Sequence, residues 1–352
     1  MTADIDMSNG RANFAFFGER EGIWHRLGQQ VDPDRVHDIE YWMELSGAKF
    51  EVHKAPINYT AKLLDGTEQT MAFDNKVVTY RNDTGAALGA VSDNKYNIVQ
   101  PAECYEFFEG FLSDNDLTLS TAGFLKGGRI VFVLANLGEN YRFMLNGTND
   151  VVQGYLRIQT SFDGSRSTTG VLTFIRQVCS NTEAAVESAT KGQQYRTTHS
   201  QHFDAEALQA AVGLMGEQAR VTVDVWESLA NVQVTDAHAR AYICEVLDIK
   251  VDDLNTYDDK GKCLVSKKLK NQVLAIGGLY KTGPGSDLPT AKGTAYGLLQ
   301  AVTAYVDHQK GTRDIYGDGK ATARMNSAWF GQGATMKLRA REMAQERFLI
   351  AA

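Results

Sequence analysis

The chain has 352 residues, of which 43% are hydrophobic and 22% charged, and its formal net charge is −7 at pH 7. This composition predicts a soluble globular protein with a full hydrophobic core, and no apolar run is long enough to predict a membrane span. The acidic balance argues against a protein that coats duplex DNA through overall charge, although a local basic patch can bind nucleic acid on an acidic body.

The cysteines and the N-terminal segment indicate the compartment. Cys104, Cys179, Cys244 and Cys263 lie far apart, with no CxxC pair. This spacing favours free thiols in a reducing compartment over a disulfide or zinc scaffold. The N-terminal residues also lack the basic-then-apolar layout of a secretory signal. We therefore expect a cytoplasmic protein.

The first 198 residues alternate short strand patterns with turn residues. The strand patterns lie at residues 50–61, 76–81, 87–91 and 129–136. Their Asp-Gly, Thr-Gly and Gly-Gly boundaries are typical of antiparallel hairpins. A helix is predicted at residues 102–113, where aromatic residues and leucine repeat at helical spacing after Pro101. The pattern indicates a meander of strands with a helix packed across it.

Residues 151–182 contain two strand patterns on either side of an Asp163-Gly164 turn. Because side chains of a strand alternate, the first run has one apolar face and one polar face. The apolar face carries Val152, Leu156 and Ile158, and the polar face carries Gln153, Tyr155, Arg157, Gln159 and Ser161. We expect the apolar face to join the core and the polar face to form a contact surface.

After residue 198 the pattern becomes helical. Helices are predicted at residues 205–229, 236–247, 267–280, 291–309 and 335–348. Thr235 and Ser266 are placed as N-caps for two of them. The sequence therefore predicts an α+β fold: a curved antiparallel sheet with packed helices over residues 1–198, followed by a mainly helical region over residues 199–352.

Four short motifs occur in a fixed order along the chain. They are WHRLG at residues 24–28, FDGS at 162–165, RQVCSNT at 176–182, and GT at 293–294 followed by QAV at 300–302 and YVDH at 305–308. This combination resembles the phage/plasmid-like proteins, a domain-of-unknown-function family of bacteriophages, prophages and plasmids. Gln300 departs from the asparagine associated with that place. The resemblance implies a mobile-element protein in a bacterial cytoplasm and implies no established reaction.

The arginines of the central hairpin, one tyrosine of that hairpin and the tryptophan of the first motif are candidates for binding. Arg157, Arg166 and Arg176 lie on or near this hairpin, where their planar cations could contact phosphates or a carboxylate. Cross-strand ion pairing is the alternative interpretation. Tyr155 and Trp24 could stack on bases, since aromatic rings stack on nucleobases.

A second basic cluster occurs late in the chain, with Lys267, Lys268 and Lys270 at its centre and aromatic residues nearby. Single-stranded nucleic-acid binders combine a positive groove with aromatic platforms. A solvated helix face is the alternative interpretation of these lysines.

Catalytic and metal-binding patterns are weak. His199 and His202 share a helical face, but no complete ligand set accompanies them, and packing is the alternative. Cys179 and Ser180 lack the Gly-x-Ser-x-Gly context of an activated nucleophile. No phosphate loop, dinucleotide fingerprint or HExxH motif occurs. We therefore assign no metal and no cofactor, and we expect a protein that is not an enzyme. An enzyme that uses Arg176, Cys179 and His199 is the least supported alternative.

These observations lead to one functional hypothesis and one rival. The leading hypothesis is a non-catalytic phage or mobile-element protein that binds single-stranded DNA as a homo-oligomer, in annealing, recombination or replication. The rival is an early phage protein that binds a host protein or a nucleotide as an inhibitor or sponge. Salt separates the two, because affinity for a polyanion falls steeply as salt rises.

Overall fold

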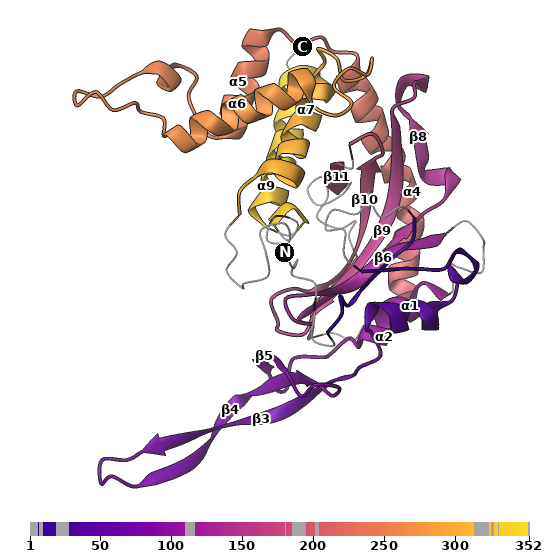
Figure 1. The fold of residues 1–352 in the computed structure, drawn as a ribbon, viewed down its shortest axis with the longest axis vertical. Coiled ribbons are helices and arrows are strands. Elements are labelled where there is room, and N and C mark those ends of the chain that lie inside the picture. The colour runs from indigo at the N-terminus through magenta and orange to yellow at the C-terminus, as the bar shows by residue number, and fades with distance from the viewer. Residues whose placement is uncertain are drawn as a thin grey trace.

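The structure is a computed structural model that describes residues 6, 10–18, 28–109, 117–179, 181–184, 195–200, 204–312, 324, 327–329 and 331–350. It has the α+β architecture that the sequence predicts, with antiparallel sheets and a helical C-terminal part (Figure 1). In this described part no helix is long and apolar enough to cross a membrane.

The larger sheet has nine strands in the order β11-β10-β9-β7-β6-β1-β2, with β12 paired to β10 and β8 to β9. The strands are β1 (Phe14–Phe16), β2 (Gln29–Gln30), β6 (Thr118–Leu125), β7 (Ile130–Asn136), β8 (Arg142–Met144), β9 (Val151–Ser161), β10 (Thr168–Arg176), β11 (Asn181–Ala184) and β12 (Tyr195–Thr197). Among the described pairs, only β1 and β2 run parallel.

One face of this sheet forms the main core. Leu156 and Ile158 of β9 are fully buried there, as the alternation predicts. On the neighbouring strand β10, the ring of Phe174 meets Trp226 of a C-terminal helix edge to face, with centroids 5.1 Å apart. The hydrophobic core cluster therefore includes residues from both sides of residue 198.

The opposite face of β9 is also buried, so the expectation of an open contact surface there is wrong. Arg157 is only 2% exposed and Gln159 only 5%. Phe132 of β7 packs edge to face on Trp329, with centroids 5.7 Å apart, and the Arg157 guanidinium lies 5.2 Å from the same indole ring. A segment distant in sequence thus covers a strand face whose polar residues suggested exposure.

A second sheet has three strands in the order β3-β4-β5. They are β3 (Val52–Lys62), β4 (Glu68–Arg81) and β5 (Ala87–Ser92). The β3–β4 hairpin projects away from the body of the molecule (Figure 1). Residues 68–75 of β4 belong to this projection, and the sequence patterns did not predict them as a strand.

Helices pack beside the larger sheet (Figure 1). They are α1 (Ile39–Ser46), α2 (Pro101–Glu106), α4 (Ala205–Ala230), α5 (Asp236–Val246), α6 (Lys267–Thr282), α7 (Ala295–Ala304) and α9 (Gln332–Gln345). Two of them, α5 and α6, extend away from the sheet (Figure 1). Tyr305–Gln309 and Glu346–Ile350 continue α7 and α9 as π-helical turns, and 3-10 turns lie at Pro33–Arg35, Glu139–Tyr141, Leu145–Gly147 and Asp252–Asn255. Of these, α7 is buried along its whole length.

The predicted N-caps are confirmed. The side chain of Thr235 accepts from the His238 amide, and that of Ser266 accepts from the Leu269 amide. The helix predicted from residue 291 begins at residue 295, because the preceding residues form a turn in which Thr294 is the N-cap. The helix predicted over residues 102–113 ends at residue 106, and residues 110–116 lie outside the described part.

Candidate functional site

A buried ion pair lies at the end of β10. Nε and Nη2 of Arg176 each donate to an oxygen of Asp150, both at 2.7 Å, and Nη2 also donates to the Gly285 carbonyl at 3.1 Å. Thr290 donates its hydroxyl to the same carboxylate. Burial disfavours the charged guanidinium, but the hydrogen bond with Asp150 and electrostatic interactions with Tyr296, Asp150 and Cys179 together outweigh it, so the pKa of Arg176 is raised. The guanidinium of Arg176 therefore makes structural contacts, with Asp150 and Gly285.

The third and fourth sequence motifs meet beside this pair. Asn181 donates its amide to the main-chain oxygen of Gln300 at 3.1 Å and to its side-chain oxygen at 2.9 Å. His308 Nε2 lies 3.0 Å from the Cys179 carbonyl and 3.2 Å from the Asn181 side-chain oxygen. These contacts fasten the start of β11 to α7 and to the turn that follows it.

This polar cluster contains a cysteine, a histidine and an asparagine, yet its geometry is not that of a cysteine nucleophile. The ring of His308 contacts the carbonyl of Cys179, and it is Arg176 that approaches the sulfur, at 3.9 Å. Burial raises the pKa of the Cys179 thiol, and Arg176 opposes this only in part. The contacts of this cluster therefore hold the start of β11 against α7, and the geometry around Cys179 does not activate its thiol.

The second motif, FDGS at residues 162–165, lies where the two sheets contact each other. Thr79 of β4 donates its hydroxyl to the Phe162 carbonyl at 2.6 Å. Gly89 of β5 lies so close to Asp163 that a Cβ there would be 2.5 Å from the Asp163 Cα. Tyr96 donates to the Ser161 carbonyl at 2.5 Å. The β9–β10 turn thus supports the base of the projecting hairpin.

The comparison with protein families gives one match, to a domain of unknown function, DUF932, over residues 87–329. This match covers more than half of the chain. The chain belongs to the DUF932 family. No curated protein and no solved structure matches it.

The DUF932 match contains the second, third and fourth motifs, and the structure gives each of them a packing role. The first motif precedes the match, and its residues 24–27, which include Trp24, lie outside the described residues. Residues 52–81, which form the projecting hairpin, also precede the match. The matched region therefore contains β5, most of the larger sheet and the helices α2, α4, α5, α6 and α7, whereas the hairpin and α9 lie outside it.

Two of the three arginines of the central hairpin, Arg157 and Arg176, lie far from a common surface. In the β9–β10 ladder Arg157 lies opposite Val171, whereas Arg176 lies opposite Val152. Arg157 and Arg176 consequently occupy opposite faces of the sheet, and each is nearly fully buried. Tyr155 shares the face of Arg157 and is partly exposed. Burial of the two guanidinium groups keeps them from direct contact with a ligand in this conformation.

His199 is engaged in packing. Its ring stacks on Tyr96, with centroids 4.1 Å apart. Its Nδ1 lies 3.0 Å from the Asn97 carbonyl, and its Nε2 lies 2.7 Å from the carbonyl of Arg166. The described residues contain no cluster of His, Cys, Asp or Glu that could hold a metal ion, and His202 lies outside them.

The three lysines predicted to bind nucleic acid, Lys267, Lys268 and Lys270, lie at the start of α6. We define the α6 basic surface as the six lysines at residues 260, 262, 267, 268, 270 and 281, a span with no acidic residue. Lys267 and Lys268 are exposed, and the Nζ of Lys270 lies 5.6 Å from the ring of Tyr257, which is 60% exposed. Burial lowers the pKa of Lys310, and the nearby charge of Lys268 lowers it further. The surface therefore places positive charge beside an aromatic ring, with Asp258 and Asp259 directly before it in the sequence and Lys281 paired with Asp236.

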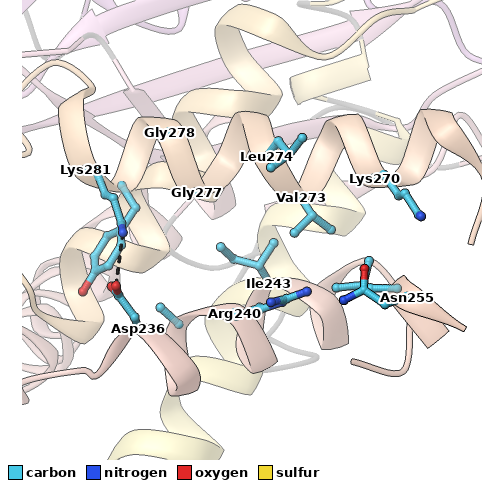
Figure 2. A pocket seen from close by; sticks show the side chains of 13 residues that line it. Asp236, Arg240, Ile243, Asn255, Lys270, Val273, Leu274, Gly277, Gly278 and Lys281 are labelled. Carbon is cyan, nitrogen blue, oxygen red and sulfur yellow. Dashed lines mark hydrogen bonds and ion pairs between the residues drawn. The ribbon is translucent and has the colours of Figure 1, made fainter. Parts of the chain in front are cut away.

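A groove of about 640 Å³ separates α5 from α6 (Figure 2). Ile243, Val273 and Leu274 supply apolar side chains to it. Its charged residues are Asp236, Arg240, Lys270 and Lys281, with Asp236 and Lys281 paired at 3.2 Å. A volume of this size falls in the range of pockets that hold ligands or partner side chains. Sequence patterns missed this groove, because it depends on how two helices pack.

Proposed function

We propose that this DUF932 protein binds single-stranded DNA as a non-catalytic protein of a phage or other mobile element, in the cytoplasm of a bacterial host. The α6 basic surface is the observation that carries the proposal. Phosphate attraction supplies most of the affinity of such proteins, and an aromatic ring holds bases without reading their sequence. Lys267 and Lys268 would contact phosphates, with Tyr257 beside Lys270 as the stacking platform.

The charge distribution supports this proposal. The chain is acidic overall, yet six lysines with no acidic residue lie between residues 260 and 281. Lys268 and Lys310 are close enough for one charge to lower the pKa of the other. Such like-charge proximity costs free energy in the free protein, and a bound phosphate would relieve it. A phosphate backbone that runs along α6 would bind more favourably, because it reduces the repulsion between these lysines.

Fluorescence anisotropy of labelled oligo(dT), titrated at several salt concentrations, tests the proposal. We expect binding that weakens steeply with salt. Replacing Lys267 and Lys268 together with alanine should weaken binding and lower the slope of log affinity against log salt by roughly 1.4, at about 0.7 per phosphate contact. The matched control is Lys76→Ala with Lys95→Ala, which removes the same charge from exposed positions in and near the second sheet.

Two results would contradict the proposal. One is no binding at low salt, and the other is an equal loss in the control variant. Binding that hardly depends on salt would favour the rival, a shaped site for a nucleotide or a host protein.

A further inference from the structure

The outer part of the β3–β4 hairpin exposes an apolar face. In the register of this hairpin Tyr59 lies opposite Met71, and alternation along the strands places Leu63 and Phe73 on the same side. The exposed fractions are 48% for Tyr59, 45% for Leu63, 39% for Met71 and 49% for Phe73. The other side carries polar residues, including Asn58, Thr60 and Thr70. An apolar stripe on a projecting two-stranded ribbon is typical of an interaction site, since such a ribbon is marginally stable alone.

The turn at the end of this hairpin is ordered by its own hydrogen bonds. The Leu63 amide donates to the Thr67 carbonyl at 2.8 Å, and the Gly66 amide donates to the Leu63 carbonyl at 3.0 Å. The Asp65 carboxylate accepts from the Thr67 amide at 2.9 Å and from its hydroxyl at 2.7 Å. These bonds lower the pKa of Asp65, so it stays ionised at neutral pH. The adjacent Leu64 side chain is fully exposed. A turn with this order loses little entropy when it binds.

The groove between α5 and α6 has the features that this turn requires. Val273, Leu274 and Ile243 offer apolar contact, and Leu274 is 72% exposed. At Gly277 and Gly278 an added Cβ would meet no atom within 4 Å, so both positions leave open space along α6 (Figure 2). Two adjacent glycines inside a helix cost helix stability, and a partner that approaches closely would explain their presence.

Charge is complementary between the two surfaces. The turn carries Asp65 and Glu68 against Lys62, which lies opposite Glu68 in the ladder, so its formal net charge is −1. The groove contributes Arg240, Lys270 and Lys281, against one acidic residue that is already paired with Lys281. We propose that the hairpin turn of one copy of this chain binds in the α5–α6 groove of a second copy.

This contact joins two different surfaces of the chain. The hairpin and the groove lie at opposite ends of the molecule (Figure 1), so a chain cannot fill its own groove. A contact between unlike surfaces repeats from copy to copy and produces a ring or an open filament. It also repeats Lys267 and Lys268, which do not line the groove, at regular intervals. The contact itself does not depend on nucleic acid, so it stands or falls separately from the proposed function.

Sedimentation velocity of the full chain without nucleic acid, over a range of concentrations, tests the proposal. We expect the wild type to form species larger than a dimer as concentration rises. Leu64→Asp in the turn and Leu274→Asp in the groove should each weaken association at least tenfold. Val221→Asp is the matched control, because Val221 is 62% exposed on α4 and lies outside both surfaces, and it should associate like the wild type.

A mixture of the two variants provides the decisive measurement. The Leu64→Asp chain keeps an intact groove and the Leu274→Asp chain keeps an intact turn, so the mixture should form dimers that do not grow. Circular dichroism and thermal melting of each variant report whether it is folded. A wild type that stays monomeric throughout would overturn the proposal, as would a mixture that shows no dimer. If Leu274→Asp weakened association and Leu64→Asp did not, the groove would bind something other than the turn, and the proposal would also be overturned.

Discussion

Replacing Asp150 with alanine should strongly destabilise this protein. The Asp150 side chain is fully buried and that of Arg176 is 3% exposed, and two hydrogen bonds of 2.7 Å join them. The substitution leaves the guanidinium charge in the interior and removes the acceptor of the Thr290 hydroxyl. Loss of one partner of a buried pair costs about 3–5 kcal/mol. A domain is stabilised by only about 5–15 kcal/mol, so much of the stability would disappear.

Urea unfolding followed by tryptophan fluorescence measures this cost. The matched control is Glu139→Ala, which breaks the exposed pair with Arg142 and should cost under about 1 kcal/mol. A double variant, Asp150→Leu with Arg176→Met, should be more stable than Asp150→Ala, because apolar side chains of similar size can replace a buried pair. A cost under about 1 kcal/mol for Asp150→Ala would refute the reasoning. So would a double variant at least as unstable as the single one.

Three further outcomes are expected. Thr235→Ala removes the N-cap of α5 and should lower the free energy of unfolding by about 1 kcal/mol in a urea titration, whereas Thr235→Ser should retain most of it. The pKa of the Cys263 thiol is lowered, chiefly by its hydrogen bond with Lys270, whereas burial raises that of Cys179. A larger fraction of Cys263 is therefore thiolate at pH 8, so iodoacetamide should modify Cys263 faster than Cys179, as followed by mass spectrometry. Lys270→Ala should reduce this difference in rate. Gly89→Ala forces a Cβ against the β9–β10 turn and should lower the free energy of unfolding by about 1–3 kcal/mol. It should also make the hairpin easier to cleave in limited proteolysis, and unchanged cleavage would contradict this.

Local patterns predicted much of the fold. The alternation along residues 151–161 correctly separates the two faces of β9, and Thr235 and Ser266 are the N-caps that their positions indicate. These features depend on neighbours in the sequence, and so the sequence reveals them. The outer half of β4 escaped prediction, because its exposed ribbon mixes polar and apolar residues without the pattern of a buried strand.

The candidate site was harder to predict, because it depends on distant partners. The ladder places Arg176 opposite Val152, and the register across the β9–β10 turn decides this pairing. The partner of Arg176 is Asp150, and Gly285 and Thr290, far along the chain, complete its surroundings. The α6 lysines were recognised correctly as a cluster because they are contiguous in sequence. Their role in binding remains a prediction.

The hairpin is held at its base, so a small rotation there produces a large displacement at its far end. Thr79 and Gly89 hold the β3–β4–β5 sheet against one turn of the larger sheet, and Arg81 at the end of β4 pairs with Asp83 at 2.7 Å. With 14 residues, β4 extends roughly 45 Å at about 3.3 Å per residue, so a rotation of about 10° at this base would move the far end by roughly 8 Å. Side chains at one short turn therefore set the reach and direction of a surface far from them.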